Sequence, residues 1–150
     1  ELHATVALAS LEDLDERVAH RSRLAAAFRT ALAEVAGVGF PAVAEQDTST
    51  YKDLTMVVEP ERFGLGAAEL AAALRAEGID SRRYYFPPVH RQKAYAHVAV
   101  TRPLPVTDRV AERVLSPPLW SQMTRPDIER VAGAVVRVQR HAPAVRRALQ

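Results

Sequence analysis

The stretch that decides the fold is YKDLTMVVEPERFGLGAAELAAALRAEGIDSRRYYF, residues 51–86. Polar and apolar residues alternate over Tyr51–Val58, and this alternation predicts a strand. An alanine-rich helix is expected from Gly66 to Glu77, because its leucines recur on one face. A second strand is expected over Ile79–Phe86. A strand, a helix and a strand in this order indicate an α/β fold with helices packed on one face of a small sheet.

Upstream of this stretch, the sequence predicts one long helix from Leu2 to Val35. No Gly or Pro interrupts it, and at 1.5 Å per residue it would extend roughly 50 Å, which exceeds the width of a domain of this size. We therefore expect one end of this helix to pack against a part of the protein outside these residues. Gly37 is placed to end the helix in the left-handed conformation, and a short strand is expected near Phe40. The apolar face of the helix is expected to comprise Leu11, Leu14, Val18, Ala25, Phe28, Leu32 and Val35.

Downstream, prolines dominate residues 87–126, which hold seven of the ten in the chain, so this region is expected to be mostly loop. One short helix is predicted from Thr107, as its N-cap, to about Val114. The last helix is predicted to begin at Thr124, because Asp127 three residues later completes a capping pattern. Its buried face is expected to comprise Ile128, Val131, Val135 and Val138.

The composition is typical of one soluble domain. The 150 residues contain no cysteine, so a disulfide framework, a thiolate zinc site and a cysteine nucleophile are excluded. Residues 1–80 carry 7 basic and 14 acidic side chains, whereas residues 81–150 carry 13 and 4. A basic half could attract nucleic acid, but no interleaved aromatics or binding motif accompany it, so nucleic-acid binding is not expected. No apolar run approaches the roughly 18 to 20 residues of a membrane helix, and a membrane partner is not expected.

Several familiar catalytic patterns are incomplete in this chain. Gly64-Leu65-Gly66 resembles the start of a dinucleotide fingerprint, but Glu69 stands at the third glycine position. The five histidines show no pairing at helical ligand spacing, so no metal site is expected. The acidic run of residues 12–16 is interpreted as the solvated face of a helix rather than as paired catalytic carboxylates.

The segment Tyr84–Tyr95 concentrates aromatic, basic and histidine side chains at the end of a predicted strand. Such a proline-stiffened loop suits a polar ligand that bears a ring and a phosphate. In the alternative interpretation, the aromatics cover the sheet edge and Pro87-Pro88 turns the chain. Composition alone leaves both interpretations open.

The string GIDSRRYYFPPVHRQKAYAH, residues 78–97, resembles the C-terminal signature of the DegT/DnrJ/EryC1/StrS family of sugar aminotransferases. ELHATVALASLEDLDERVAHRSRLAAAFRTAL at the start of the chain is similar to the helix that links the two domains in this family. YKDLTMVV resembles the first main strand of the small domain, and VLSPPLWSQMTRPDIERVAGAV resembles its closing turn and last helix. These pieces cover about residues 1–141 in the family's order.

The resemblance implies the small C-terminal domain of a fold type I transferase that depends on pyridoxal 5'-phosphate. Residues 1–36 are then the interdomain linking helix, and residues 37–150 are the small domain with a mainly antiparallel sheet. In the family, a lysine of the preceding large domain holds the cofactor as a Schiff base. Neither Lys52 nor Lys93 suits that role, so no catalytic or cofactor-binding residue is expected in this chain, which should be inactive alone.

The resemblance further implies a cytoplasmic homodimer that converts a keto nucleotide sugar to an amino sugar, with Glu or Gln as amino donor, for polysaccharide biosynthesis. Alternatively, the chain is a stand-alone nucleotide-sugar or protein-binding module without catalysis. By position in the motif, the aromatic and histidine side chains should contact the sugar or its phosphates, and the arginines should support them because guanidinium groups clamp phosphate. The residues so assigned are Tyr84, Tyr85, His90, Arg82, Arg83 and Arg91.

Overall fold

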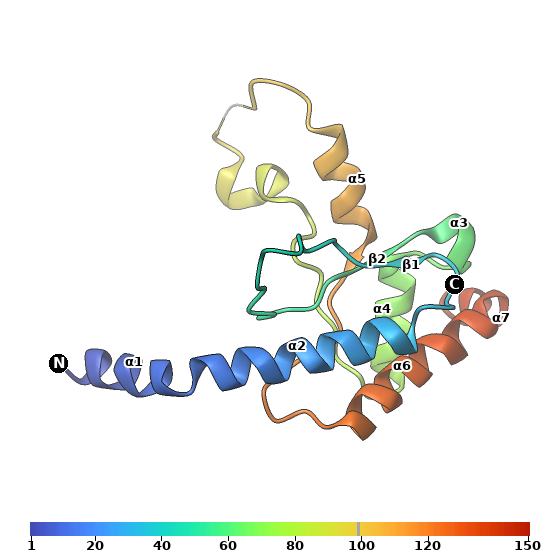
Figure 1. Cartoon of the computed structure of the whole chain (residues 1–150). Coiled ribbons are helices and arrows are strands. Elements are labelled where there is room, and N and C mark those ends of the chain that lie inside the picture. The colour runs from blue at the N-terminus through green and yellow to red at the C-terminus, as the bar shows by residue number, and fades with distance from the viewer. Residues whose placement is uncertain (99) are drawn as a thin grey trace.

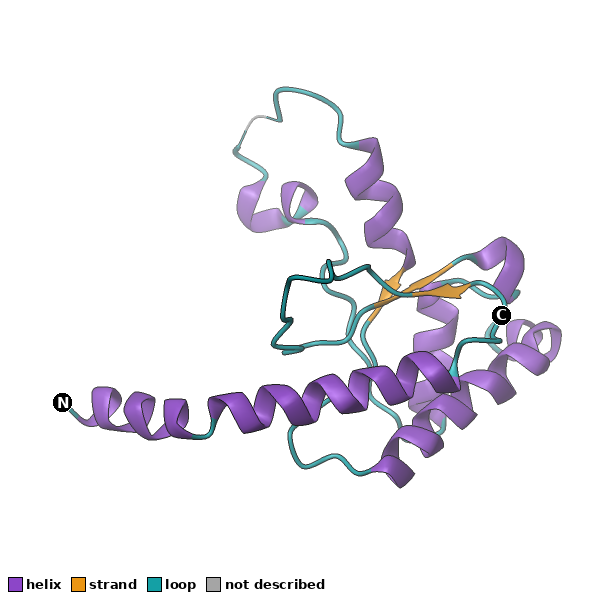
Figure 2. Cartoon of the chain, in the orientation of Figure 1, coloured by secondary structure: helices purple, strands orange, loops and turns teal. Residues whose placement is uncertain are grey.

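The computed structural model describes residues 1–98 and 100–150, and within them a small antiparallel sheet lies at the centre of the fold (Figures 1 and 2). Its strands lie in the order β1 (Val38–Gly39), β2 (Met56–Val58) and β3 (Val114–Leu115). The central strand β2 therefore pairs with both neighbours. The predicted α/β class with a small, antiparallel sheet is confirmed.

The strand predicted over Tyr51–Val58 is shorter than expected, because only its last three residues pair. In register, Val38 lies opposite Val58, and Met56 lies opposite Leu115. The flanking strands β1 and β3 are only two residues long each, so neither extends far enough to pair with residues 51–55. The predicted alternation nevertheless holds on the buried side, where Leu54, Met56 and Val58 are all enclosed in the core.

The strand predicted over Ile79–Phe86 is wrong. Arg82 alone forms a bridge, with Ser116, through main-chain hydrogen bonds of 2.9 and 2.7 Å. The chain then turns, since the amide of Phe86 donates to the carbonyl of Arg83 at 3.0 Å, and a turn cannot continue a ladder. The third strand is β3 instead, at the point where the short helix was expected to end.

Three helices, α2, α4 and α6, pack together on one side of the sheet, as Figure 2 shows. Their apolar faces meet β2 and β3 in a core that includes Phe28, Met56, Leu70, Leu74, Leu115, Ile128 and Val135. The helices are α1 (Leu2–Glu12), α2 (Leu14–Ala31), α3 (Pro60–Phe63), α4 (Ala67–Ala76), α5 (Pro105–Arg113), α6 (Arg125–Arg140) and α7 (Ala142–Ala148), with 3-10 turns η1 (Val89–Arg91) and η2 (Lys93–Tyr95). Across residues 1–98 and 100–150, no helix combines the length and the apolar composition that a bilayer crossing requires.

The single helix predicted from Leu2 to Val35 is two helices, which meet at Asp13 and end at Ala31. Asp13 precedes the acidic first turn of α2, where negative charge favours a helix start. Every residue of α1 is exposed, and α1 extends away from the rest of the fold (Figure 1). The predicted apolar face is thus buried only in its second half, over Ala25, Phe28, Leu32 and Val35, whereas Leu11 and Leu14 are exposed.

The predicted start of the last helix is confirmed. α6 begins after Thr124, whose amide and hydroxyl both donate to the Asp127 carboxylate, at 2.8 and 2.6 Å. The predicted N-cap at Thr107 is wrong, because α5 already begins at Pro105. Proline suits the first helical position, since its missing N–H would have no partner there.

Candidate functional site

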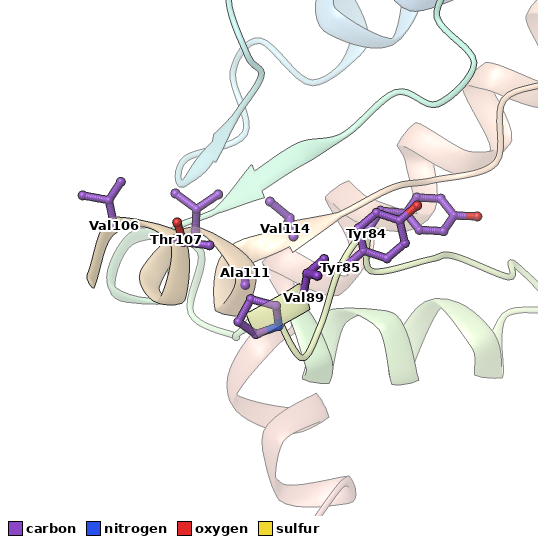
Figure 3. Close-up of a pocket in the computed structure, with 9 residues that line it drawn as sticks. Tyr84, Tyr85, Val89, Val106, Thr107, Ala111 and Val114 are labelled. Atoms are coloured by element: carbon purple, nitrogen blue, oxygen red, sulfur yellow. The ribbon is translucent and has the colours of Figure 1, made fainter. Parts of the chain in front are cut away.

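The candidate site lies on an arm formed by residues 84–98, residues 100–104 and helix α5, which projects from the sheet edge (Figure 1). The Arg82–Ser116 bridge joins the base of this arm to the end of β3. A pocket of about 350 Å³ opens between the two sides of the arm. Figure 3 shows residues from both sides around it, including Tyr84, Tyr85 and Val89 on one side and Thr107, Ala111 and Val114 on the other.

The aromatic side chains at the pocket are accessible to a ligand. The rings of Tyr84 and Tyr85 lie 5.3 Å apart between centroids and are tilted by 59°. Tyr85 is 60% exposed, and Tyr84 and Phe86 are also exposed. Exposed, neighbouring aromatic faces can stack on a flat ring and can donate a hydroxyl hydrogen to a polar group. This arrangement favours the ligand interpretation of the loop over a covering of the sheet edge.

Arg83 holds the aromatic turn against α5. Its guanidinium donates to the carbonyls of Glu112, at 2.8 Å, and Ala111, at 3.3 Å, near the C-terminal end of the helix. It also lies 4.0 Å from the centroid of the Phe86 ring, within cation–π distance. Partial burial lowers the pKa of Arg83, against the opposing charge of Glu112. The positive charge is well placed at the negative end of the helix dipole.

His90 and Arg91 both bind one carboxylate on α5. The Nε2 atom of His90 lies 3.0 Å from one oxygen of Asp108, and Arg91 donates to the other oxygen at 2.6 Å. Burial alone would raise the pKa of Asp108, but the hydrogen bond and charge of Arg91, together with those of His90, lower it below its ordinary value. Sequence reasoning missed this contact, because the partners of Asp108 lie 17 and 18 residues away.

A second, mostly apolar pocket of about 390 Å³ adjoins the first, and Val89 and Thr107 line both. His90 lines this second pocket together with Tyr95, Val98, Val100 and Leu104. The structure thus brings Tyr84, Tyr85 and His90 to two adjoining pockets. Two apolar cavities with a few polar groups fit a ligand that has a ring and some hydroxyl groups.

Arg82 lies apart from these pockets, at the base of the arm. Its guanidinium contacts Asp80 at 3.1 Å, and both side chains are largely exposed, at 67% and 61%. The three predicted arginines therefore differ. Arg83 and Arg91 are bound to α5, whereas Arg82 contacts Asp80; the side chains of Arg82 and Arg91 are similarly exposed, at 67% and 61%.

Neither lysine of the chain fits a Schiff-base role. Lys52 lies in a bend before β2 and Lys93 lies in η2, and both are exposed, outside the linings of the two pockets. A lysine that forms a Schiff base needs a lowered pKa, from a desolvated pocket or a neighbouring cation.

Comparison with known proteins gives consistent matches. Residues 1–136 match the DegT/DnrJ/EryC1/StrS aminotransferase family. The chain is similar to S. venezuelae DesV, solved in complex with a ketimine intermediate, with 34% identity and a TM-score of 0.79 over 91% of this chain and 35% of DesV. It is also similar to DesI, solved in the presence of its TDP-sugar product, with 28% identity and a TM-score of 0.85 over 95% of this chain and 36% of DesI.

A family aminotransferase from Brucella abortus also matches, with 28% identity and a TM-score of 0.75 over 88% of this chain and 34% of that one. The chain thus spans about a third of the length of the solved proteins that it matches.

Proposed function

The chain belongs to the DegT/DnrJ/EryC1/StrS aminotransferase family, and we propose that it is the C-terminal domain of an enzyme that converts a keto nucleotide sugar to an amino sugar. The observation that carries the proposal is the arm with its paired pockets, where tyrosines and a carboxylate-bound histidine meet. The similarity to DesI, solved with its TDP-sugar product, supports a nucleotide sugar as the ligand.

We propose pyridoxal 5'-phosphate as the cofactor, which supplies an electron sink for moving protons at the amino-bearing carbon. Because both lysines of this chain are exposed and lie away from the pockets, these residues do not fit the cofactor's Schiff base. The residues that hold it are therefore proposed to lie in a large domain outside this chain. Residues 1–36, which include α1 and α2, are proposed to link the two domains, and residues 37–150 are proposed to form the small domain, which alone is expected to be inactive.

The arm's own residues bind and orient the sugar nucleotide. Tyr84 and Tyr85 present faces and hydroxyls to a ring of the substrate, and His90 exchanges a hydrogen bond with a sugar hydroxyl. Arg82 contributes positive charge toward the phosphates, with Arg83 and Arg91 as supporting charges within the arm. The amino donor is proposed to be Glu or Gln, and the enzyme is proposed to work as a cytoplasmic homodimer with shared active sites.

The experiment that tests this function uses the complete reading frame that contains the chain. The purified product should absorb as a pyridoxal-phosphate protein and should transfer the amino group of Glu or Gln to a nucleotide keto sugar. His90→Ala should lower turnover or sugar affinity while the cofactor absorbance stays intact. His97→Ala is the matched control, because His97 is an exposed histidine on the same arm and lines neither pocket.

Two results would contradict the proposal. If the complete product transfers no amino group to any nucleotide keto sugar, the enzyme assignment fails. If the product also binds nucleotide sugar without cofactor, as measured by calorimetry, the binding-module alternative replaces it. Unchanged kinetics in His90→Ala would remove His90 from the substrate site.

A further inference from the structure

Asp108 carries a contact that the proposed function does not yet explain. Its carboxylate receives two side chains from consecutive residues of η1, one on each oxygen: His90 Nε2 at 3.0 Å and Arg91 at 2.6 Å. The His90 and Asp108 side chains are largely enclosed, with exposures of 17% and 24%. A partly desolvated contact between a carboxylate and an imidazole is stronger than the same contact in water.

The chemistry of the pair fixes the protonation of the ring. An ionised carboxylate only accepts hydrogen bonds, so the Nε2 atom of His90 must carry the hydrogen that lies between them. In the neutral ring, the other nitrogen, Nδ1, is then an unprotonated acceptor. Among the described residues, Nδ1 has no hydrogen-bond partner, while the same side chain lines the pocket of about 390 Å³. The contact therefore leaves Nδ1 for a ligand.

Three features suit Asp108 to hold the ring in one orientation. Arg91 occupies the second oxygen and, with His90, lowers the pKa of Asp108, so the carboxylate stays an acceptor at neutral pH. Asp108 lies on a helix, and Arg83 ties the far end of that helix to the aromatic turn. Among the described residues, the ionisable side chain that lines the pocket with His90 is Tyr95, so no second carboxylate competes there for the ring. Groups held on regular elements orient their partners more precisely than groups on loops.

We propose that Asp108 is a positioning residue: its carboxylate holds His90 as the Nε2–H tautomer and presents Nδ1 to a hydroxyl of the nucleotide sugar. The role in sugar binding rests on the proposed function. The tautomer of His90 does not rest on the proposed function. It can be measured in this chain, because the helices and strands of the chain enclose a hydrophobic core.

The first experiment reads the tautomer directly. In the chain labelled with ¹⁵N-histidine, imidazole nitrogen shifts are recorded at rising pH until they no longer change with pH, so that the neutral ring is observed. His90 should be predominantly the Nε2–H form, and Asp108→Ala should convert it to the mixture shown by His97. Arg91→Gln, which removes the other contact to the same carboxylate, should leave the His90 signal unchanged. A mixture at His90 in the unaltered chain, or an equal change in Arg91→Gln, would overturn the proposal.

The second experiment measures the consequence in the complete enzyme. Asp108→Ala should lower kcat/KM for the nucleotide sugar about tenfold or more, the loss expected for one charge-assisted hydrogen bond. The half-reaction with the amino donor should stay within about twofold, because the donor does not need the His90 contact. Asp108→Glu should recover part of the loss. Equal losses in both half-reactions would show a merely structural role and refute positioning. If the unaltered enzyme transfers no amino group, the proposed function fails while the tautomer measurement still decides the role of Asp108.

Discussion

Replacing Gly37 with alanine should destabilise the fold more than any comparable glycine replacement in the chain. Gly37 links the turns after α2 to β1 with a φ of +79°, and its carbonyl accepts the amide of Glu59 at 2.7 Å. A methyl group there would lie 2.5 Å from the Phe63 nitrogen, 2.8 Å from the Glu59 carbonyl oxygen and 3.0 Å from the Arg62 carbonyl carbon. All three are main-chain atoms, and the Phe63 amide itself bonds to the Glu59 carbonyl.

The expected magnitude has two parts. Placing an alanine in the left-handed region costs about 1–2 kcal/mol. Overpacking against main-chain atoms that cannot turn aside adds about 1–3 kcal/mol. A total of about 3 kcal/mol corresponds to a fall in Tm of about 6–12 °C for a chain of this length.

Replacements of two other glycines separate the backbone contribution from the overpacking contribution. Gly78 has a φ of +72°, but the nearest atom to an added methyl is the guanidinium of Arg130 at 3.8 Å, so Gly78→Ala should cost about 1 kcal/mol. Gly39 has no positive φ, and among the described residues no heavy atom lies within 4 Å of the added methyl, so Gly39→Ala should stay within about 0.5 kcal/mol. Urea unfolding followed by circular dichroism gives the three values. Equal losses for Gly37→Ala and Gly78→Ala would refute the argument from close contact.

Two further substitutions test contacts of the arm and of α6. Arg83→Met should lower the free energy of unfolding by about 1 kcal/mol, because it removes two hydrogen bonds to α5 carbonyls. It should also raise the rate of amide hydrogen exchange in the 84–90 turn. Amides in this turn that stay protected would contradict the anchoring role of Arg83. Asp127→Asn should destabilise the chain near neutral pH, because hydrogen bonds from Thr124 lower the pKa of the Asp127 carboxylate in the folded state. A carboxylate whose pKa is lowered on folding stabilises the fold at pH values above its unfolded pKa of ~3.9. The difference in unfolding free energy between Asp127→Asn and the unaltered chain should therefore shrink as the pH falls below about 4. A difference that grows at low pH would refute this prediction.

The parts of the fold that the sequence predicted are those set by local chemistry. The capping pair of Thr124 and Asp127 lies within three residues. Gly37 has the predicted left-handed conformation, but it adopts it in a turn after α2 has already ended at Ala31, so its predicted place at the helix end is wrong. Strand boundaries depend on partners far away. β3 is recognisable only once Val57 lies opposite Val114, a pairing across more than fifty residues that no local period encodes.

The same distinction holds for the site. The loop at Tyr84–Tyr95 stood out because its aromatic and basic residues are neighbours in sequence. Asp108 did not, since its proposed role depends on a contact with His90 that exists only in the folded arm. Local patterns therefore singled out the residues that are proposed to face a ligand, whereas Asp108, which is proposed to orient His90, is recognisable only in the structure.

The distribution of arginine contacts bears on how this arm could bind a phosphate. A phosphate would compete with main-chain carbonyls of α5 for Arg83 and with a largely enclosed carboxylate for Arg91. For Arg82 it would compete only with Asp80, in an exposed pair of the kind that contributes about 0–1 kcal/mol. A guanidinium has five donors, so the two bound arginines can still contribute charge, but their positions are set by the protein. Arg82 is consequently the arginine best able to move toward a ligand, whereas Arg83 holds the aromatic turn against α5 and Arg91 is bound to Asp108.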